Sequence, residues 1–392
     1  MKLAVIGFGQ CGSRIADEFA RLNKKARTHR KIEVITGAFA VNTDAADLTG
    51  LSTIKADYQH RILIGGRKTG GHGVGKINEL GAEVAREDGD KVVDAIRTSS
   101  KRFYETDAFL LIASASGGTG SGALPIMTQF IKERYAEKPV YCLVVLPFEH
   151  EEATEERTIY NAAVCLKSVN SVADATILFD NQRYVRKDSS LRNNIAKINA
   201  MIVAPFYNIL CAGEERKSKY IGAKTLDAGD IIQTLVGWTV IGYGKASLPT
   251  LRIPFQETRD FNKKGIEIYK GIQAMDEAIS ELSIRCKPMD ASRALYLLSA
   301  PAKEMNMDAV KGLGSYLREL APKAIIRNGD YPRERGSLDI TVILSELSDV
   351  EKVRNFYTDS ASYISEIAKR QDELKKKLKG IDEAAKDIPS LL

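Results

Sequence analysis

Several features are absent or scarce in this 392-residue sequence, and each absence narrows what the protein can be. The five cysteines are widely spaced and form no Cys-x-x-Cys pair, which argues against both a disulfide framework and a zinc site. No apolar run approaches the roughly 20 residues that span a membrane, and the first seven residues fit a strand entering a glycine turn better than a signal peptide. We therefore expect a soluble protein of the reducing cytoplasm with no integral membrane segment.

An excess of charge of one sign is also missing. The chain has 57 Lys and Arg residues against 51 Asp and Glu residues, and its formal net charge of +6 is small for its length. Charges of both signs are spread along the chain, whereas nucleic-acid binders concentrate Lys and Arg on one face with interleaved aromatic residues. We therefore expect no nucleic-acid partner. The 44% hydrophobic content is typical of globular proteins, and 392 residues predict two domains.

The most informative stretch joins an apolar run, Phe109–Ala113, to a glycine-rich loop. The run has no polar alternation, so it predicts a strand buried on both faces of a parallel sheet. Four glycines follow within six residues, with two hydroxyl side chains between them: Gly117, Gly118, Thr119, Gly120, Ser121 and Gly122. Such a loop turns successive N–H groups toward an anion, and a helix predicted over Ala123–Tyr135 would add its N-terminus. The alternative is a flexible turn, which needs only one or two glycines.

Three more loops follow apolar runs in the first part of the chain. The run Leu3–Ile6 enters Gly7-Phe8-Gly9-Gln10-Cys11-Gly12 and a helix from about Ser13 to Asn23, an arrangement that matches the dinucleotide fingerprint but is weak evidence alone. A strand over Glu33–Val41 ends in Asn42-Thr43-Asp44, which either bind a ligand at the sheet edge or cap the next turn. Arg61–Ile64 leads to Gly70–Lys76, which fits most of a P-loop. Ile77 replaces the Ser or Thr that would coordinate magnesium, so we expect a mobile glycine loop.

The remaining pattern predicts an α/β fold in two parts joined by a central helix. Strands at Val140–Leu146 and Ala175–Phe179, with a helix from about Thr154 to Val169 between them, complete a doubly wound parallel sheet. Apolar residues at helical spacing predict the central helix over Asn193–Cys211. A smaller α+β domain follows, with strands at Ala294–Ser299, Lys323–Arg327 and Ile340–Leu344 and helices near Ile266–Ile284 and Met305–Leu320. The predicted boundaries are 1–190, 191–230 and 231–392.

The end of the chain predicts a long amphipathic helix. Its apolar residues fall on one heptad phase: Val350, Val353, Tyr357, Ile364, Ile367, Leu374, Leu378 and Ile381. Such a stripe is explained more simply by packing on the parent domain than by an intermolecular coiled coil.

The glycine loop at Gly117–Gly122 after its buried strand resembles the signature loop of tubulin and FtsZ. Gly9–Gly12 resembles the first loop of tubulins, whereas Ala40–Asp44 and Ala123-Leu124-Pro125 are more similar to FtsZ. That mixture resembles the CetZ group, the archaeal tubulin-like proteins implicated in cell shape. The resemblance implies a cytoplasmic GTPase that assembles head to tail into filaments in control of cell shape or division, with its active site completed by the next subunit. Accessory proteins are compatible with it.

The resemblance also implies a set of nucleotide-binding residues. The phosphates would contact Gly9, Gln10, Cys11, Gly12 and the loop Gly117–Gly122, including Gly118, Thr119, Gly120 and Ser121. The γ-phosphate would contact Gly71, Gly73 and Gly75; Asn42 and Asp44 would lie beside the nucleotide; Glu151 and Arg157 would hold the ribose; and Asn181 and Asn199 would pair with guanine. Magnesium would be held by phosphates and water, with no protein ligand.

Asp227 and Asp230 are the candidate catalytic residues. They lie three positions apart where a helix is expected to begin, and two carboxylates so placed can orient and polarise an attacking water. The simpler alternative is a helix N-cap with a first-turn acid, worth about 1 kcal/mol.

Two other functions stay open. A nicotinamide-dependent oxidoreductase, with Asp44 on the ribose, leaves the second glycine loop unexplained, and a non-hydrolysing paralogue that modulates filaments leaves the acid pair unexplained.

Overall fold

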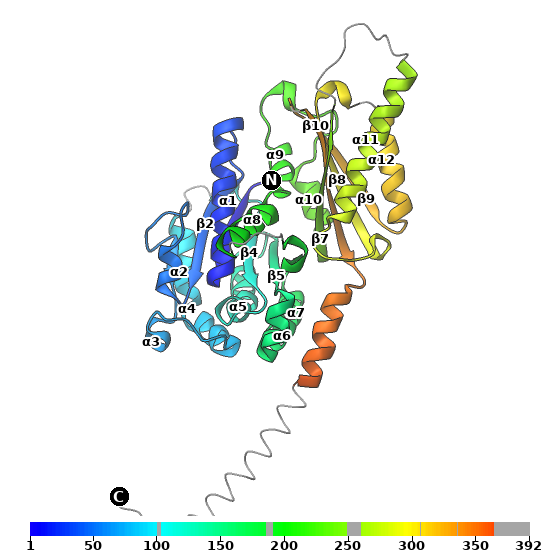
Figure 1. Ribbon diagram of the computed structural model, residues 1–392. Helices are drawn as coiled ribbons and strands as arrows, with labels where there is room; N and C mark the ends of the chain where they lie inside the picture. The colour runs from blue at the N-terminus through cyan, green and yellow to red at the C-terminus, as the bar shows by residue number, and fades with distance from the viewer. Residues whose placement is uncertain (100–102, 186–190, 249–259, 306, 335, 364–392) are drawn as a thin grey trace, which may run out of the picture.

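The computed structural model describes residues 1–99, 103–185, 191–248, 260–305, 307–334 and 336–363. Within them, strands form one ten-stranded sheet in the order β3-β2-β1-β4-β5-β6-β7-β10-β8-β9 (Figure 1). The strands are β1 Leu3–Phe8, β2 Ile35–Asn42, β3 Arg61–Leu63, β4 Ala108–Ser114, β5 Val140–Leu146, β6 Ala175–Asp180, β7 Gly237–Ser247, β8 Ala291–Ala300, β9 Ile325–Pro332 and β10 Ser337–Leu347.

Helices lie on both faces of this sheet (Figure 1). They are α1 Gly9–Arg30, α2 Ala45–Thr49, α3 Gly66–Thr69, α4 Asn78–Ser99, α5 Thr119–Arg134, α6 Glu149–Thr154, α7 Glu156–Val172, α8 Leu191–Val203, α9 Phe206–Ala212, α10 Ala228–Thr234, α11 Asp260–Ser280 and α12 Met307–Leu320. Residues 351–363 form a further helix, here called the C-terminal helix. Alternate residues of each strand point to opposite faces, so the sheet separates two apolar cores.

The first six strands are parallel, and β1 lies between β2 and β4. Chain order therefore runs outward in both directions from the β1–β4 pair, which is the switch point of a doubly wound sheet. The prediction of such a sheet is confirmed. Because the strands are parallel, their carboxyl ends meet at one edge, and the loops after β1, β2, β4, β5 and β6 all lie there.

The strand β7 is missing from the sequence-based prediction, and it joins the two parts of the fold. Its first residues, Gly237–Thr239, pair in parallel with β6, and the following residues pair antiparallel with β10. Glycines at 237, 242 and 244 interrupt its apolar pattern, which hides the strand from a periodicity argument. The smaller domain therefore continues the same sheet. The strand expected at Lys323–Arg327 is shifted, because β9 begins at Ile325 and ends at Pro332.

Several predicted helices differ from those observed; the first, expected from about Ser13 to Asn23, is α1 Gly9–Arg30, and the one expected near Ile266–Ile284 is α11 Asp260–Ser280. The central helix is broken into α8 and α9, because Pro205 has no N–H to donate and disfavours helix in the residue before it. The helix α5 begins at Thr119 instead of Ala123, so Thr119–Gly122 form its first turn. The helix α7 begins at Glu156, after a separate short helix α6. The last two differences concern helix starts, where periodicity carries least information, whereas the break at Pro205 lies inside the predicted helix.

The segment Asn194–Ala212 is apolar and long enough to cross a membrane by length and composition alone. In the structure it contains the break at Pro205, and 67% of its most apolar stretch is buried within the fold. Core helices of globular proteins pass the same test, so the segment is weak evidence for a membrane span.

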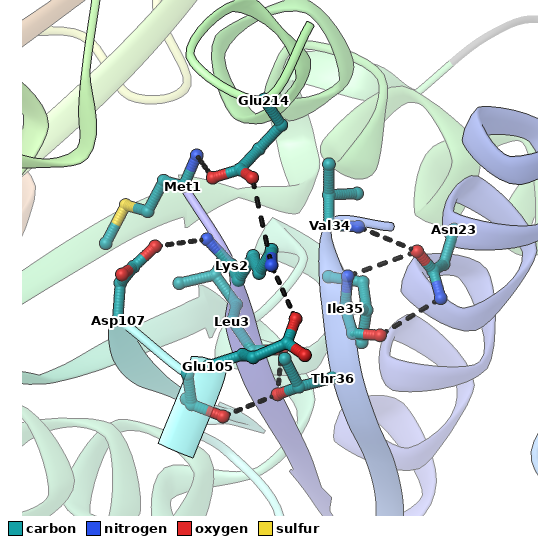
Figure 2. Close-up of polar contacts among 11 residues, drawn as sticks. Met1, Lys2, Leu3, Asn23, Val34, Ile35, Thr36, Glu105, Asp107 and Glu214 are labelled. Carbon is teal, nitrogen blue, oxygen red and sulfur yellow. Dashed lines mark hydrogen bonds and ion pairs between the residues drawn. The ribbon is translucent and has the colours of Figure 1, made fainter. Parts of the chain in front are cut away.

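Polar contacts connect several segments at the amino edge of the sheet, which lies at the opposite end of β1 from the glycine loops (Figure 2). The Lys2 backbone N–H donates to Asp107 Oδ2 at 2.7 Å, and Lys2 Nζ donates to Glu105 Oε2 at 2.6 Å. Glu214, which follows α9, approaches the same ammonium at 4.0 Å. The amide of Asn23 on α1 pairs with the backbone of Ile35, accepting its N–H at 3.1 Å and donating to its C=O at 3.0 Å. The helix α9 therefore ends at the amino edge of the sheet.

The C-terminal helix packs on the body of the protein through its first three turns. Val350, Val353, Phe356 and Ser360 are buried, while Tyr357 is 36% exposed. The prediction that the stripe packs on the parent domain is confirmed for this part, with Phe356 in place of Tyr357 on the buried face. The positions from Ile364 onward lie outside the described residues.

Replacing Asp17 with Ala should lower the free energy of unfolding by about 2–4 kcal/mol. This carboxylate is 6% exposed and accepts the N–H groups of Ser52, Thr53 and Ile54 at 3.1, 2.7 and 2.7 Å, so its removal leaves three donors unpaired. Urea unfolding measures the change. Asp90→Ala on the exposed face of α4 is the control, expected to change stability by less than about 0.5 kcal/mol. Equal effects from both variants would contradict the assignment.

Candidate functional site

Two helix N-termini meet at the switch point between β1 and β4. The helix α1 begins at Gly9, directly after β1, and α5 begins at Thr119, shortly after β4. Gly9 has a φ of +67°, and a Cβ placed on it would lie 3.0 Å from the backbone nitrogen of Gly120, so the two loops are in contact. The first N–H groups of a helix have no partner within it, and the helix dipole adds partial positive charge there. Two helix ends that meet in this way are suited to bind an anion.

Open space lies in front of the signature loop. A Cβ placed on Gly117 would meet no atom within 4 Å. The two hydroxyl groups predicted as donors are engaged within the protein: Thr119 Oγ1 lies 2.6 Å from Thr43 Oγ1, and the Ser121 hydroxyl donates to the Gly117 carbonyl. The anion-binding capacity of this loop therefore lies chiefly in backbone N–H groups.

The loop Gly70–Lys76 lies against the end of β2. Gly73 N–H donates to the Thr43 carbonyl at 3.1 Å, and Ala45 N–H donates to the Gly71 carbonyl at 3.0 Å. The three predicted glycines have positive φ angles, +83° at Gly71, +81° at Gly73 and +56° at Gly75. The far end of the loop packs on the signature loop, since a Cβ on Gly118 would lie 2.6 Å from Val74 Cγ2. The loop therefore reaches from β2 to the N-terminus of α5.

Asp47 on α2 links two predicted site residues and was missed by the sequence argument. Gln10 Nε2 donates to Asp47 Oδ1 at 2.6 Å, and Asn42 Nδ2 donates to Asp47 Oδ2 at 3.0 Å. Asp44 Oδ1 accepts the N–H of Asp47 at 3.1 Å and so caps α2. Of the two alternatives for Asp44, the structure contains the helix cap. Gln10, Asn42 and Asp44 are thereby brought together beside the glycine loops.

Asn161 on α7 is a second missed residue, and it joins the two glycine loops. It is fully buried, and its Nδ2 donates to the Lys76 carbonyl at 2.9 Å and to the Ser116 carbonyl at 3.1 Å. Its Oδ1 is buried and has no partner among the described atoms. Asn161 and Thr158 are the two polar residues on the otherwise apolar buried face of α7, and neither belongs to a motif that could have identified it from the sequence.

Glu151 and Arg157, the predicted ribose contacts, lie beside different loops. Burial, and after it the charge of Glu151, raises the pKa of the Cys11 thiol to about 12, so Glu151 lies near the N-terminus of α1. A thiol with that pKa stays protonated at neutral pH and is no nucleophile. Arg157 Nε donates to the Lys76 carbonyl at 3.1 Å, and its Nη2 pairs with Glu79. Arg157 is therefore engaged with the loop that precedes α4.

A hollow of about 310 Å³ lies at the same sheet edge beside Asn181. Asn181 begins the short 3₁₀ helix η2, Asn181–Tyr184, directly after β6, and its side chain makes no hydrogen bond with the described residues. The hollow is lined by Phe148, Glu149, His150, Gln182, Val185, Asn194, Ile195 and Ile198. Asn199 is 7% exposed and is not among the lining residues, whereas Asn194 is, which the sequence argument did not propose.

Asp227 and Asp230 lie far from the glycine loops. Ile231, next to Asp230, lines the same small apolar cavity as Met1 and Leu3, at the amino end of β1. The six residues of β1 place that end about 20 Å from Gly9. The helix α1 gives an independent measure. Its last residue, Arg30, lies 3.7 Å from Glu215, and the 22 residues of α1 span about 33 Å from Gly9. A Cβ on Gly213, two residues before Glu215, would lie 3.2 Å from Asp227 Cα, so Asp227 lies near that end of α1. The acid pair therefore lies at the opposite edge of the sheet.

The two acids are held locally in a defined arrangement. Asp227 is the N-cap of α10, and its Oδ1 accepts the N–H of Asp230 at 2.8 Å. Asp230 Oδ1 pairs with Arg327 Nε of β9 at 3.4 Å. The N-cap alternative is thus present in the structure. Both side chains keep one carboxylate oxygen without a partner among the described residues.

Comparisons with known proteins agree with this geometry. A model of the Tubulin/FtsZ family, GTPase domain, matches residues 2–187, and one of the tubulin-like CetZ C-terminal domain matches residues 188–362. Tubulin-like protein CetZ1 of Haloferax volcanii is 33% identical over 370 residues, covering 90% of each chain.

Two solved structures from Haloferax volcanii are also similar. The GDP-bound monomer of CetZ1 is 29% identical, with a TM-score of 0.78, and covers 93% of this chain and 99% of its own. The GTPγS-bound protofilament of CetZ2 is 26% identical, with a TM-score of 0.78, and covers 94% of this chain and 100% of its own. The resemblance drawn from the glycine loops is confirmed. The chain belongs to the Tubulin/FtsZ family of GTPases and, within it, to the CetZ group.

Proposed function

We propose that this chain binds and hydrolyses GTP and assembles head to tail into filaments in the cytoplasm, in control of cell shape or division. The observation that carries the proposal is the arrangement of two sites on opposite edges of one sheet. Two helix N-termini meet beside an open Gly117 at one edge, and the acid pair lies at the other. The GTPγS-bound protofilament of CetZ2 supports both the ligand and the assembly.

The residues at the carboxyl edge fit a guanine nucleotide. Backbone N–H groups of Gly9–Gly12 and Gly117–Ser121 would hold the α- and β-phosphates, and the loop through Gly71, Gly73 and Gly75 would close over the γ-phosphate. Glu151 and Arg157 would hold the ribose. The unpaired amide of Asn181 would pair with guanine, with Asn199 as the second proposed contact.

Magnesium would be held by phosphate oxygens and water. The part of the chain that the structure describes has no group of three or more His, Cys, Asp or Glu residues that could hold a metal ion. A cation between phosphates neutralises the charge that develops during phosphoryl transfer, which is the chemistry it would supply here.

Hydrolysis is assigned to the contact between two subunits. Asp227 and Asp230 lie about 20–30 Å from the glycine loops of their own chain, a separation that no side chain can span. A second copy stacked head to tail would place its acids over the first copy's γ-phosphate. Such a contact repeats without closing, so it generates a filament. The oxidoreductase alternative is disfavoured, because the Tubulin/FtsZ GTPase-domain model matches residues 2–187, which include both glycine loops.

Replacing Gly117 with Val should weaken GTP binding by on the order of 100-fold while leaving the fold intact. The side chain would enter the space where a phosphate binds, yet it meets no protein atom within 4 Å. Calorimetric titration with GTP measures the affinity, and the melting temperature reports on the fold. Gly50→Val is the control, since Gly50 is exposed and its added Cβ makes only ordinary contacts. Unchanged GTP affinity in Gly117→Val would overturn the phosphate assignment.

GTP should raise the melting temperature much more than ATP does, because stabilisation follows a ligand's affinity for the folded state. Asn181→Ala should reduce the GTP shift toward the ATP value by removing the amide that distinguishes the bases. Asn170→Ala, an exposed amide on α7, is the matched control and should keep the full GTP shift. Equal shifts from GTP and ATP in the unaltered protein would contradict the guanine assignment.

Replacing Asp227 with Asn should reduce GTP turnover by about 100-fold or more without weakening GTP binding. Asn is as good an N-cap as Asp, so α10 keeps its cap and only the charge is lost. Phosphate release and calorimetry measure the two properties separately.

Mixing the Asp227→Asn and Gly117→Val variants should restore activity that neither has alone, because one chain then supplies the nucleotide and the other the acids. Activity of the unaltered protein should also rise faster than linearly with its concentration. A turnover per molecule that is independent of concentration across the assembly range would place the catalytic groups within one chain.

A further inference from the structure

A single lysine of the C-terminal helix connects that helix to two segments of the nucleotide site. Lys352 Nζ lies 2.8 Å from Asp180 Oδ1 at the end of β6 and 3.2 Å from Glu152 Oε1 on α6. The contact is largely shielded from solvent, with side chains 22% exposed for Lys352 and 11% for Asp180. Among the described residues, Lys352 is the one cation within 4.0 Å of either carboxylate.

Asp180 controls the start of the segment that carries Asn181. Its Oδ1, the oxygen that accepts Lys352, also accepts the N–H of Gln182 at 3.1 Å and so caps η2. Its backbone N–H donates to the Ser283 carbonyl at 2.8 Å. The carboxylate is therefore fixed between the C-terminal helix and η2, and a change in its orientation would move the first residues of η2.

Glu152 lies on α6, whose first residues, Glu149 and His150, line the hollow beside Asn181 together with Gln182 of η2, so α6 and η2 are here called its two walls. The walls already touch, since the Glu149 N–H donates to Gln182 Oε1 at 3.4 Å, and Glu152 itself lines the neighbouring groove with Asp180 and Lys352. Burial raises the pKa of the Glu152 carboxyl, and the nearby Lys352 opposes that rise. Without Lys352, two shielded carboxylates from the two walls would face each other with no cation between them, and like charges so placed repel.

The surroundings cannot replace this lysine. The groove beside the contact is lined by acids on several elements, Glu149, Glu281, Glu351 and Asp359, and its other cations are Arg183 and Arg285. The Arg183 guanidinium is engaged with the Ser280 carbonyl. Removal of the Lys352 charge would therefore leave a larger excess of negative charge in this groove, where Glu152 of α6 and Asp180 at the start of η2 face each other.

The far end of the C-terminal helix contacts α7. The Tyr363 ring packs edge-on against the Tyr160 ring of α7, with centroids 6.2 Å apart. The Tyr160 hydroxyl is hydrogen-bonded to Glu79, and Glu79 pairs with Arg157. The helix therefore lies along the outside of the site and contacts it at both ends.

We propose that the C-terminal helix sets base selectivity, with Lys352 as the positioning residue that holds together the two walls of the hollow beside Asn181. The proposal rests on the assignment of Asn181 to guanine made above. Lys352 acts through Asp180 and Glu152, so it does not touch the nucleotide. Its loss lets the two walls move apart and Asn181 turn away from the base, while the phosphate loops keep their contacts.

Calorimetric titration of the full chain with GTP, ATP and inorganic triphosphate tests this proposal. Lys352→Met keeps the apolar stem and removes the charge, so GTP affinity should fall by on the order of tenfold and the GTP-to-ATP affinity ratio should fall with it. Affinity for inorganic triphosphate, which has no base, should be unchanged. Lys352→Arg should restore the ratio. Arg354→Met, exposed on the same helix, is the matched control and should leave all three affinities unaltered.

A second variant keeps the test decisive if Lys352→Met folds poorly. Glu152→Gln together with Lys352→Met removes one charge of each sign, so the walls no longer repel and the GTP-to-ATP ratio should be largely restored. Equal losses for GTP and inorganic triphosphate would mean that Lys352 is only a structural contact, and an unchanged ratio in Lys352→Met would overturn the proposal. If the unaltered protein binds GTP and ATP equally, the guanine assignment fails instead.

Discussion

The contact between the N-termini of α1 and α5 is the constraint on which the rest of the structure depends. At the switch point of a doubly wound sheet the connections after two neighbouring strands leave toward opposite faces and open a crevice at the carboxyl edge, and here α1 and α5 begin on the two sides of that crevice. Glycine at positions 9 and 120 lets the two backbones meet at about van der Waals distance. Two helix ends then face one space, and other elements of the site take their places around it: the loop Gly70–Lys76 through Thr43, and α7 through Asn161.

The second constraint is the length of the strands, which sets the distance between the carboxyl edge and the amino edge of the sheet. A phosphate held at the carboxyl edge and an acid pair held at the amino edge are separated by the length of β1 and by nearly the length of α1. The broken helix formed by α8 and α9 runs between the same two edges, since α8 lines the hollow beside Asn181 and Glu214, after α9, approaches Lys2. A site divided in this way is incomplete in one chain, and this incompleteness makes assembly a requirement of the proposed chemistry.

The sequence argument succeeded where a prediction depends on the backbone. Unbroken apolar runs predicted the buried strands of the doubly wound sheet, and the loop glycines have positive φ angles at Gly9, Gly71, Gly73 and Gly75, although not within Gly117–Gly122. It failed where function depends on a single side chain brought in by tertiary packing. Asn161, Asp47 and Lys352 each join segments distant in sequence, and each is one ordinary polar residue in a helix. The strand β7 was hidden for a related reason, since its glycines remove the apolar alternation that marks a strand.

Asp227 shows why two competing interpretations of one residue can both hold. As an N-cap it uses Oδ1 to accept the N–H of Asp230, and its Oδ2 makes no contact with a described residue. Asp230 likewise uses one oxygen toward Arg327. Capping therefore fixes the orientation of the first carboxylate, and the ion pair fixes the second, while each retains an oxygen without a contact among the described residues. A carboxylate that orients water must itself be held rigidly, so the stabilising role of the cap is a condition of the proposed catalytic role and not an alternative to it.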